Sequence, residues 1–491
     1  MGRRGGHARG GLGLAGNEQA PRPARLAGGA LGLFDSVVMA VAGSAPAYSI
    51  AATTATLVAT VGLGGPAALL YAGIPMFGVA WAFLYLGRTG ANAGASYHWV
   101  ARSLHPVLGY MAGWALVVSA TLFMVAGSLP AGAVTLGLIN PAAADNVLLV
   151  TTVGAGWFLL MAAMVLVGVR VTANVQWIMS SVEVAVLVLL AVLALAHARP
   201  AGAAPATWAW LGLGAFHGIG GFAGGVVVAA FYYWGWDVTA NLNEETRAPR
   251  RVPGLAGVVG LAVVLCLFVT FATIANMRLS PREISANSAD VLLVLGRTVW
   301  PGPGGPLLVL AVLLSTVATL ETTLIQVSRT VFAMARDRVA PARLAYVHPR
   351  WRTPLWATIL VAALALTLFV LSSLVGSVSA ALSNAVNAIA LQIVVYYTLA
   401  AVSVVVYYRH MIFRSLSNFL FIGLWPSLGA VFMLGCGLYD VPQLSPVSLA
   451  VGLGLLAVGL VPLALYRARG VAYFQAPRMH AVDADGGEAA G

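Results

Sequence analysis

Residues 33–60 read LFDSVVMAVAGSAPAYSIAATTATLVAT, an apolar stretch whose one charged residue, Asp35, stands near its beginning. The stretch exceeds the roughly 20 apolar residues that a helix needs to cross a bilayer. Its middle holds Gly43-Ser44-Ala45-Pro46. Proline removes a helix hydrogen bond and disfavours helix at the residue before it. The sequence therefore predicts a membrane span with either a packed kink or a functional break at its centre.

The rest of the chain is equally apolar. Of its 491 residues, 60% are hydrophobic and 8% are charged, whereas a soluble domain has roughly 25% charged residues. This composition excludes a soluble enzyme, a nucleic-acid-binding protein and a disordered chain, and it predicts a polytopic membrane protein. Cys266 and Cys436 both lie in apolar runs, so we expect neither a disulfide framework nor a cysteine metal site.

Apolar segments of sufficient length predict an all-α protein with twelve transmembrane helices. They cover residues 32–60, 66–86, 106–139, 147–169, 174–197, 215–243, 254–276, 305–335, 354–375, 378–408, 417–438 and 445–466. The least marked boundary, between the ninth and tenth, rests on Ser372-Ser373 and Gly376-Ser377. Residues 1–30 and 471–491 are predicted to be tails, the first of them disordered.

The arginines predict the orientation. With both termini in the cytoplasm, 22 of the 26 basic residues lie inside and four lie outside, as the positive-inside rule requires. The inner loop 336–353 holds five of them. It either anchors the topology or also attracts anionic membrane lipid.

The sixth span combines aromatic, glycine and acidic residues. Residues 231–237 read FYYWGWD in the middle of an apolar run. A carboxylate in a span costs roughly 3 kcal/mol on insertion scales, so Asp237 must face protein or water. The aromatic residues either line a cavity or form an interfacial belt, and their central position favours the cavity.

Two more acids lie inside apolar runs, Glu183 in the fifth span and Glu321 in the eighth. Each is by default a functional candidate in a membrane helix. The alternative is a neutral carboxyl that contributes only to packing. Enzyme motifs such as H-E-x-x-H and the P-loop do not occur, so neither covalent chemistry nor a cofactor is expected.

Four short stretches together resemble the amino acid–polyamine–organocation superfamily of secondary transporters. They are Gly43-Ser44-Ala45-Pro46, residues 92–100 with 109–114, residues 231–253, and residues 328–354, which read SRT…ARD…P…HP…TP. The resemblance covers residues 30–470 and implies the leucine-transporter fold. In that fold spans one to five (residues 31–200) and six to ten (201–410) form two inverted repeats, and spans eleven and twelve (411–470) are peripheral.

The resemblance also implies a substrate site at the unwound parts of spans one and six, in line with the general rule that paired interruptions mark the binding site. Gly43, Ser44 and Ala45 would offer N–H groups and a hydroxyl to a substrate carboxylate. Carbonyls around Phe231, Tyr232, Tyr233 and Trp234 would accept from an ammonium group, with Gly235 allowing close approach and Phe231 acting as a lid. Further candidates for the side-chain pocket are Ser119, Phe123 and Thr323.

The three buried acids are the candidates for proton coupling. Glu183 falls where some proton-coupled members of the superfamily carry a basic residue, and we expect it to be the coupling group. Asp237 either caps the restarted helix, which is the favoured expectation, or binds a proton or a cationic substrate. Glu321 is the third candidate.

The resemblance thus predicts a multi-pass amino acid permease of the cytoplasmic membrane that works by alternating access, expected to be a proton symporter. Its partner is a small molecule, an amino acid or related amine. The alternatives are an exchanger of amino acids or polyamines without proton coupling, and a channel or nutrient receptor on a transporter fold.

Overall fold

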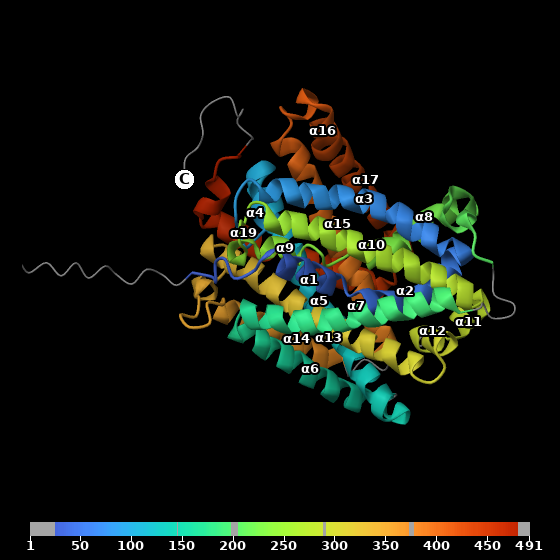
Figure 1. Cartoon of the computed structure of the whole chain (residues 1–491). Coiled ribbons are helices and arrows are strands. Elements are labelled where there is room, and N and C mark those ends of the chain that lie inside the picture. Colours follow the sequence, from blue (N-terminus) through green and yellow to red (C-terminus); the bar gives the residue numbers. More distant parts are fainter. Residues whose placement is uncertain (1–24, 145, 198–204, 288–290, 373–377, 480–491) are drawn as a thin grey trace, which may run out of the picture.

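The computed structural model describes residues 25–144, 146–197, 205–287, 291–372 and 378–479, with side chains at all of these except 141, 231 and 378–384. Within these ranges the regular structure is helical, apart from isolated β-bridges between Leu31 and Thr246 and between Val347 and Pro354. The long helices lie side by side with their axes roughly along one direction (Figure 1). The described chain therefore forms one helical bundle.

The α-helices of the bundle differ widely in length, from three to 34 residues. They are α1 Leu33–Ser44, α2 Pro46–Val61, α3 Gly65–Gly87, α4 Ser96–Ser103, α5 Pro106–Ile139, α6 Val147–Val167, α7 Val169–Ala196, α8 Gly218–Tyr232, α9 Val238–Asn241, α10 Val252–Arg278, α11 Pro281–Ala286, α12 Val291–Val299, α13 Gly304–Arg336, α14 Leu355–Ser372, α15 Val378–Tyr407, α16 Leu416–Asn418, α17 Trp425–Asp440, α18 Pro446–Val458 and α19 Leu460–Ala468.

Ten helical stretches among the described residues are long and apolar enough to cross a membrane. The first, Leu33–Gly87, has 55 residues and contains both of the first two expected spans. The expected sixth span, 215–243, is not one helix, because α8 ends at Tyr232 and only the short α9 follows. The expected boundary between the ninth and tenth spans coincides with the end of α14 and the start of α15, and residues 373–377 between them lie outside the described ranges.

The first span is broken at Ala45, which adopts a left-handed conformation with φ 47° and ψ 67°. Pro46 is the first residue of α2, where its missing N–H costs nothing. The residue before a proline is disfavoured in the right-handed helix, so the helix cannot continue smoothly through Ala45. Of the two readings of the sequence, the structure shows a break rather than a kink.

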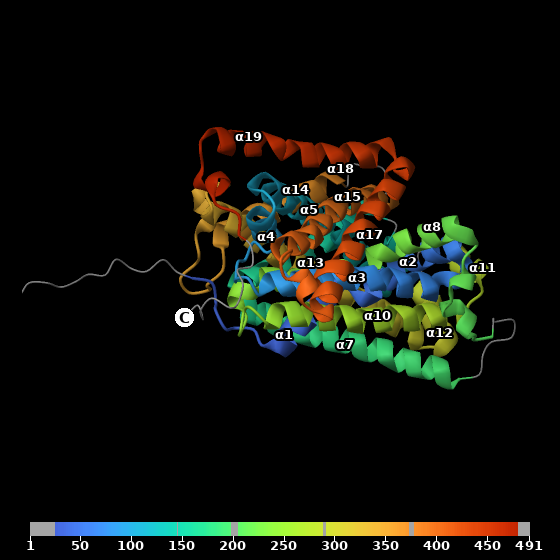
Figure 2. The same ribbon diagram turned by 90° about the horizontal axis from the view of Figure 1, so that it is seen from above.

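The centre and the edge of the bundle differ in burial. In its most apolar window α13 is 83% buried, whereas the last span, Pro446–Ala468, is 22% buried. Figure 2 shows α18 and α19 along one side of the bundle. The candidate site is built around α13, away from this edge.

Parts of both expected tails pack against the bundle. Leu26 is buried, and its carbonyl accepts a hydrogen bond from the Arg352 guanidinium at 2.9 Å. Tyr473 is also buried and stacks on Tyr97 at 5.2 Å between ring centroids. Disorder up to residue 30 is therefore wrong for residues 25–30, while residues 1–24 and 480–491 lie outside the described ranges. The two described ends lie at the same end of the bundle (Figure 1).

Candidate functional site

The two interrupted helices touch at a pair of glycines. A Cβ atom on Gly43 would collide with the carbonyl oxygen of Gly235, and one on Gly235 would collide with the carbonyl oxygen of Gly43. Gly235 also has φ +102°, a conformation that favours glycine. The Thr319 hydroxyl of α13 donates to the Gly43 carbonyl at 3.0 Å. Both breaks are thus held together at the centre of the bundle.

The backbone N–H groups at the break are already engaged. Gly43 and Ser44 lie within α1, and the Ala45 N–H donates to the Val41 carbonyl at 3.1 Å. At the start of α2, Ala47 N–H donates to Glu183 Oε1 at 2.9 Å and Tyr48 N–H to Ser315 Oγ at 3.2 Å. The expectation that residues 43–45 offer free N–H groups is therefore wrong, because α1 continues through Ser44.

Glu183 reaches this position from α7 and is fully buried. Its carboxylate lies at the N-terminus of α2, where the helix dipole favours negative charge. Its other oxygen, Oε2, has no hydrogen-bond partner among the described residues. Glu183 therefore acts as a built-in cap for the second half of the broken helix.

A cavity lies beside the break. The space between its lining atoms is about 590 Å³, including the part that opens to solvent. Its lining residues are Gly43, Ser44, Ala45, Tyr48, Ser49, Ala52, Thr53, Phe123, Trp234, Thr319, Val386, Ile389 and Ile393. None of these described lining residues carries a charge.

Five predicted site residues line this cavity: Gly43, Ser44, Ala45, Phe123 and Trp234.

Other predicted pocket residues lie elsewhere. Ser119 is fully buried and donates to the Leu116 carbonyl, and Thr323 is buried outside the cavity lining. The Tyr233 hydroxyl donates to the Leu69 carbonyl at 2.8 Å, and the Tyr232 hydroxyl lies 3.4 Å from Thr54 Oγ1. Both tyrosines pack against Phe268 instead of lining the cavity. Phe231 belongs to α8, but its side chain lies outside the described set.

Asp237 is buried in a network of donors. It accepts from Tyr397 at 2.9 Å, Tyr396 at 3.2 Å and Gln326 at 2.9 Å. Asp237 stands at the N-cap position of α9, but its side chain makes no capping hydrogen bond. The favoured expectation that the Asp237 side chain caps α9 is therefore wrong. The carboxylate instead accepts hydrogen bonds from hydroxyl and amide donors of α13 and α15.

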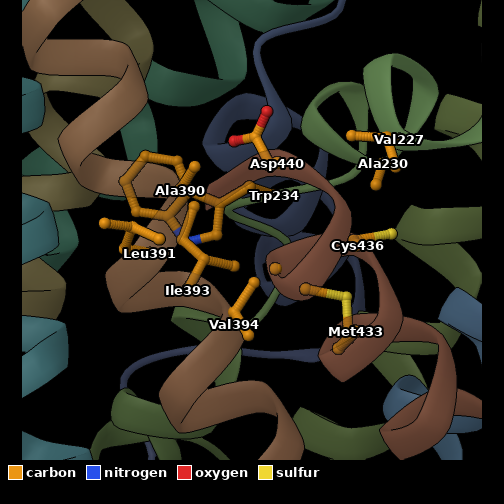
Figure 3. A pocket seen from close by; sticks show the side chains of 11 residues that line it. Val227, Ala230, Trp234, Ala390, Leu391, Ile393, Val394, Met433, Cys436 and Asp440 are labelled. Atoms are coloured by element: carbon orange, nitrogen blue, oxygen red, sulfur yellow. The ribbon is translucent and has the colours of Figure 1, made fainter. Parts of the chain in front are cut away.

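Trp234 connects this network to the cavity wall. Its indole N–H donates to the Tyr396 hydroxyl at 2.7 Å, and its ring meets Phe123 edge-on at 5.1 Å. Trp234 and Ile393 also line a second, mostly apolar cavity between α8, α15 and α17 (Figure 3). The indole therefore forms a wall shared by the two cavities.

Glu321 pairs with α7. Gln176 Nε2 donates to Glu321 Oε2 at 2.6 Å and to the Ala318 carbonyl at 2.8 Å. Both residues are fully buried, and Glu321 does not line the cavity. Glu321 thus lies on the α7 side of α13.

Two ion pairs close the end of the bundle that carries the described chain ends. Arg329 holds Glu245 with two bonds of 2.9 and 3.0 Å, and both side chains are fully buried. Arg336 holds Glu244, which also accepts from the Ala93 N–H at 2.8 Å. We call this group, residues 93, 244, 245, 329 and 336, the inner seal, after the side of the membrane that the arginine distribution predicts for this end. In the sequence these residues stand out only as parts of the family motifs, and the two arginines as orientation marks. An arginine inside an apolar run nevertheless signals a buried partner.

Titratable groups beside the inner seal are strongly affected by burial. Burial, with the nearby Arg102 and Arg336 charges, lowers the pKa of His98 to about 4. Burial raises the pKa of Asp337, against the hydrogen bond from the Tyr97 hydroxyl at 2.9 Å. His98 is therefore neutral at physiological pH. In the described part of the chain, no three His, Cys, Asp or Glu residues are grouped to hold a metal ion.

Comparison with known proteins identifies relatives over most of the chain. The family described as amino acid permease matches residues 31–458. An uncharacterized transporter of Mycobacterium tuberculosis is 28% identical over 374 residues, which are 76% of this chain and 79% of the relative. A serine/threonine exchanger of Bacillus subtilis is 28% identical over 156 residues, 31% of this chain and 35% of the exchanger. A low-affinity putrescine importer of Escherichia coli is 25% identical over 316 residues, 61% and 66% of the two chains.

Proposed function

The chain belongs to the amino acid permease family, and from this premise we propose that it imports a neutral amino acid across the cytoplasmic membrane by alternating access, coupled to protons. The observation that carries the proposal is the uncharged cavity where two interrupted helices meet. Paired interruptions at mid-membrane are the usual place of a transporter's substrate site.

The proposed architecture has twelve crossings with both termini in the cytoplasm. Residues 31–200 and 201–410 form the two inverted repeats, with the broken first and sixth crossings in corresponding positions. Residues 411–470 form two peripheral crossings. The exposed last span supports this assignment, as does the excess of arginine on one side.

The cavity suits a zwitterion. The hydroxyl protons of Ser44, Ser49 and Thr53 are used on backbone carbonyls, so these oxygens can only accept, and they would receive the substrate's ammonium group. Tyr48 also lines the cavity, and its hydroxyl is the proposed donor for the substrate carboxylate. The absence of charge among the described lining residues disfavours a cationic side chain.

Glu183 is the proposed coupling group. Its carboxylate holds the N-terminus of α2 through Ala47. A proton on Glu183 removes the charge that favours this position, so the contact weakens and the broken helix is released for the conformational change. Protonation and movement are thereby linked.

Uptake into proteoliposomes tests the proposal. We expect L-serine, L-alanine or L-leucine to accumulate above equilibrium when the outside is acid, and L-arginine and putrescine not to compete. Glu183→Gln should abolish accumulation and retain exchange of internal for external substrate. Tyr48→Phe should raise the substrate KM about tenfold, since a hydrogen bond to a charged group is lost. Equal uptake at equal and unequal pH would refute the coupling, and competition by putrescine alone would refute the neutral substrate.

A further inference from the structure

The buried face of α7 carries a stripe of polar side chains. Thr172, Gln176, Ser180 and Glu183 follow one another at intervals of four, four and three residues, which places them on one helix face. Each is at most 4% exposed. Glu321 of α13 faces the stripe through its contact with Gln176. The stripe runs from the Ala47 contact toward the start of α7.

Four atoms along this stripe have no hydrogen-bond partner among the described residues. They are Gln176 Oε1, Ser180 Oγ, Glu183 Oε2 and Glu321 Oε1. A buried polar atom without a partner is unfavourable, and such atoms in native proteins are usually satisfied by bound water. Four of them on facing helices form a built site for small hydrogen-bonding ligands, namely water and protons.

The hydrogen bonds fix which oxygens are free. The Ala318 carbonyl can only accept, so the Gln176 atom beside it is the amide nitrogen, which also donates to Glu321 Oε2. The Ala47 N–H likewise occupies Glu183 Oε1. A proton on either carboxyl group therefore sits most favourably on the unpartnered oxygen, Oε1 of Glu321 or Oε2 of Glu183.

The spacing suits a short chain of water molecules. Gln176 and Glu183 are seven residues apart, or about 10.5 Å along the helix axis, with Ser180 between them. A hydrogen bond between oxygens spans about 2.8 Å. One or two water molecules on each side of the Ser180 hydroxyl would bridge the gaps, and that hydroxyl can both donate and accept.

Other charged groups do not compete for this site. The elements packed against α7 are α1, α6, α10, α12 and α13. Arg329 and Arg336 of α13 are held by Glu245 and Glu244. The remaining described charged residues of these helices and of α7 lie at helix ends or on the surface, and they are Asp35, Arg170, Arg278 and Arg297. Asp35 accepts a hydrogen bond from the Trp177 indole. Arg278 donates to the carbonyls of Ala194 and His197.

We propose that α7 and α13 enclose a file of bound water that carries the coupling proton between Glu183 and the inner end of the bundle, with Glu321 as a second proton-binding group and Gln176 as its positioning residue. The inference rests on the proposed function. It adds a proton route that is separate from the substrate route, because the cavity is lined by Thr319 but not by Glu183, Gln176 or Glu321. The substrate and the proton thus approach the helix break from different sides of α13.

The test measures substrate and proton movement in the same proteoliposomes, with radiolabelled L-serine, L-alanine and L-leucine and a pH-sensitive dye inside. We expect Glu321→Gln and Ser180→Ala to lower proton uptake per substrate at least fivefold while exchange stays within twofold of the wild type. Thr316→Val, a buried change on α13 whose hydroxyl bonds only the Val312 carbonyl, is the matched control and should change neither.

A second readout does not depend on transport. Infrared difference spectra between acid and alkaline samples should contain two protonated-carboxyl bands, one lost in Glu183→Gln and the other in Glu321→Gln. Wild-type proton uptake in both Glu321→Gln and Ser180→Ala would overturn the inference, as would accumulation driven by a sodium gradient at equal pH. If the wild type exchanges amino acids without moving protons, the proton file is refuted and the permease stands. If it exchanges none of them, the proposed function itself fails.

Discussion

Removing the negative charge of the inner seal should open the end of the bundle that carries the described chain ends, which we propose faces the cytoplasm. Arg329 and Glu245 are both fully buried and form two parallel bonds of 2.9 and 3.0 Å. Glu245→Gln leaves the guanidinium buried without its counter-charge in the sealed state. In a state with the inner end open, water would solvate both side chains. The substitution therefore destabilises the sealed state selectively.

The size of the effect follows from the burial of the pair. Breaking a buried ion pair by removing one partner costs about 3–5 kcal/mol. Each 1.4 kcal/mol is a factor of ten, so the sealed-to-open ratio should fall about 10²- to 4 × 10³-fold. Glu244 and Arg336 hold the same end with bonds of 2.8 and 3.0 Å, at a partly exposed site where a pair contributes less. They retain part of the seal, so we take tenfold as the smallest expected change.

A cysteine reporter on the inner path measures this ratio. Thr323 is 5% exposed on α13, between the cavity residue Thr319 and the Gln326 contact of Asp237. In a protein with Cys266→Ala and Cys436→Ala, Thr323→Cys is labelled with a membrane-impermeant thiol reagent in inside-out vesicles. Glu245→Gln should speed labelling at least tenfold. Glu283→Gln, the same change at an exposed helix cap, is the matched control and should leave the rate unchanged.

Swapping the charged residues at positions 245 and 329 distinguishes the effect of the ion pair from the effect of altered packing. Glu245→Arg combined with Arg329→Glu should label more slowly than either single variant, because the pair is restored. A labelling rate within threefold of the parent in Glu245→Gln would refute the role of the seal. The role would also be refuted if the double variant were labelled as fast as expected from adding the effects of the two single substitutions.

Three further outcomes are expected. Gly235→Ala should abolish uptake of L-serine, L-alanine and L-leucine, because φ +102° costs about 1–3 kcal/mol for a non-glycine residue and the new Cβ meets the Gly43 carbonyl; Gly220→Ala, with open space around it, is the control. Tyr397→Phe should lower the stability of the detergent-solubilised protein by about 1–3 kcal/mol, measured as a fall in Tm, because Asp237 Oδ1 loses its donor. Burial lowers the pKa of His98 from 6.5 to about 4. Between these pH values the unfolded chain protonates this residue and the folded protein does not, so the free energy of unfolding should fall by about 3 kcal/mol as the pH drops. His98→Gln should flatten this part of the Tm profile.

For each of these three predictions, a specific result would contradict the reasoning. Normal uptake in Gly235→Ala would show that the two breaks do not need their close contact. An unchanged Tm in Tyr397→Phe would mean that Asp237 draws its stabilisation from Gln326 and Tyr396 alone. An equal acid loss in wild type and His98→Gln would assign the pH dependence to a group other than His98. Asp337 is not that group, because its raised pKa means that acid favours the folded state.

The broken spans and the family were predictable from sequence because both rest on local signals. Proline at position 46 predicts an interruption of the helix, either a packed kink or a break, and the structure shows a break at Ala45. An acid in an apolar run must be buried, and Glu183, Asp237 and Glu321 are all at most 1% exposed. The resemblance to the superfamily of amino acid permeases is confirmed by the family match.

The partners of these acids were not predictable, because they come from distant parts of the chain. Asp237 meets Tyr396 and Tyr397 about 160 positions away, and Glu183 meets Ala47 across 136 positions. Which aromatic residue faces the cavity was equally undetermined. Neighbouring positions near a helix end point in different directions, so Trp234 lines the cavity while Tyr232 and Tyr233 pack against Phe268.

The positions of the three acids also separate their roles in a way that their burial alone does not. Asp237 is saturated by three donors, so proton binding there would disrupt a complete network. Glu183 and Glu321 each keep one oxygen free, so a proton can bind there without displacing a donor, and at Glu183 the lost charge weakens the Ala47 contact. Of the two, only Glu183 touches the broken helix directly. We therefore propose that coupling belongs to Glu183, that Glu321 supplies or removes its proton, and that Asp237 fixes the position of the second break.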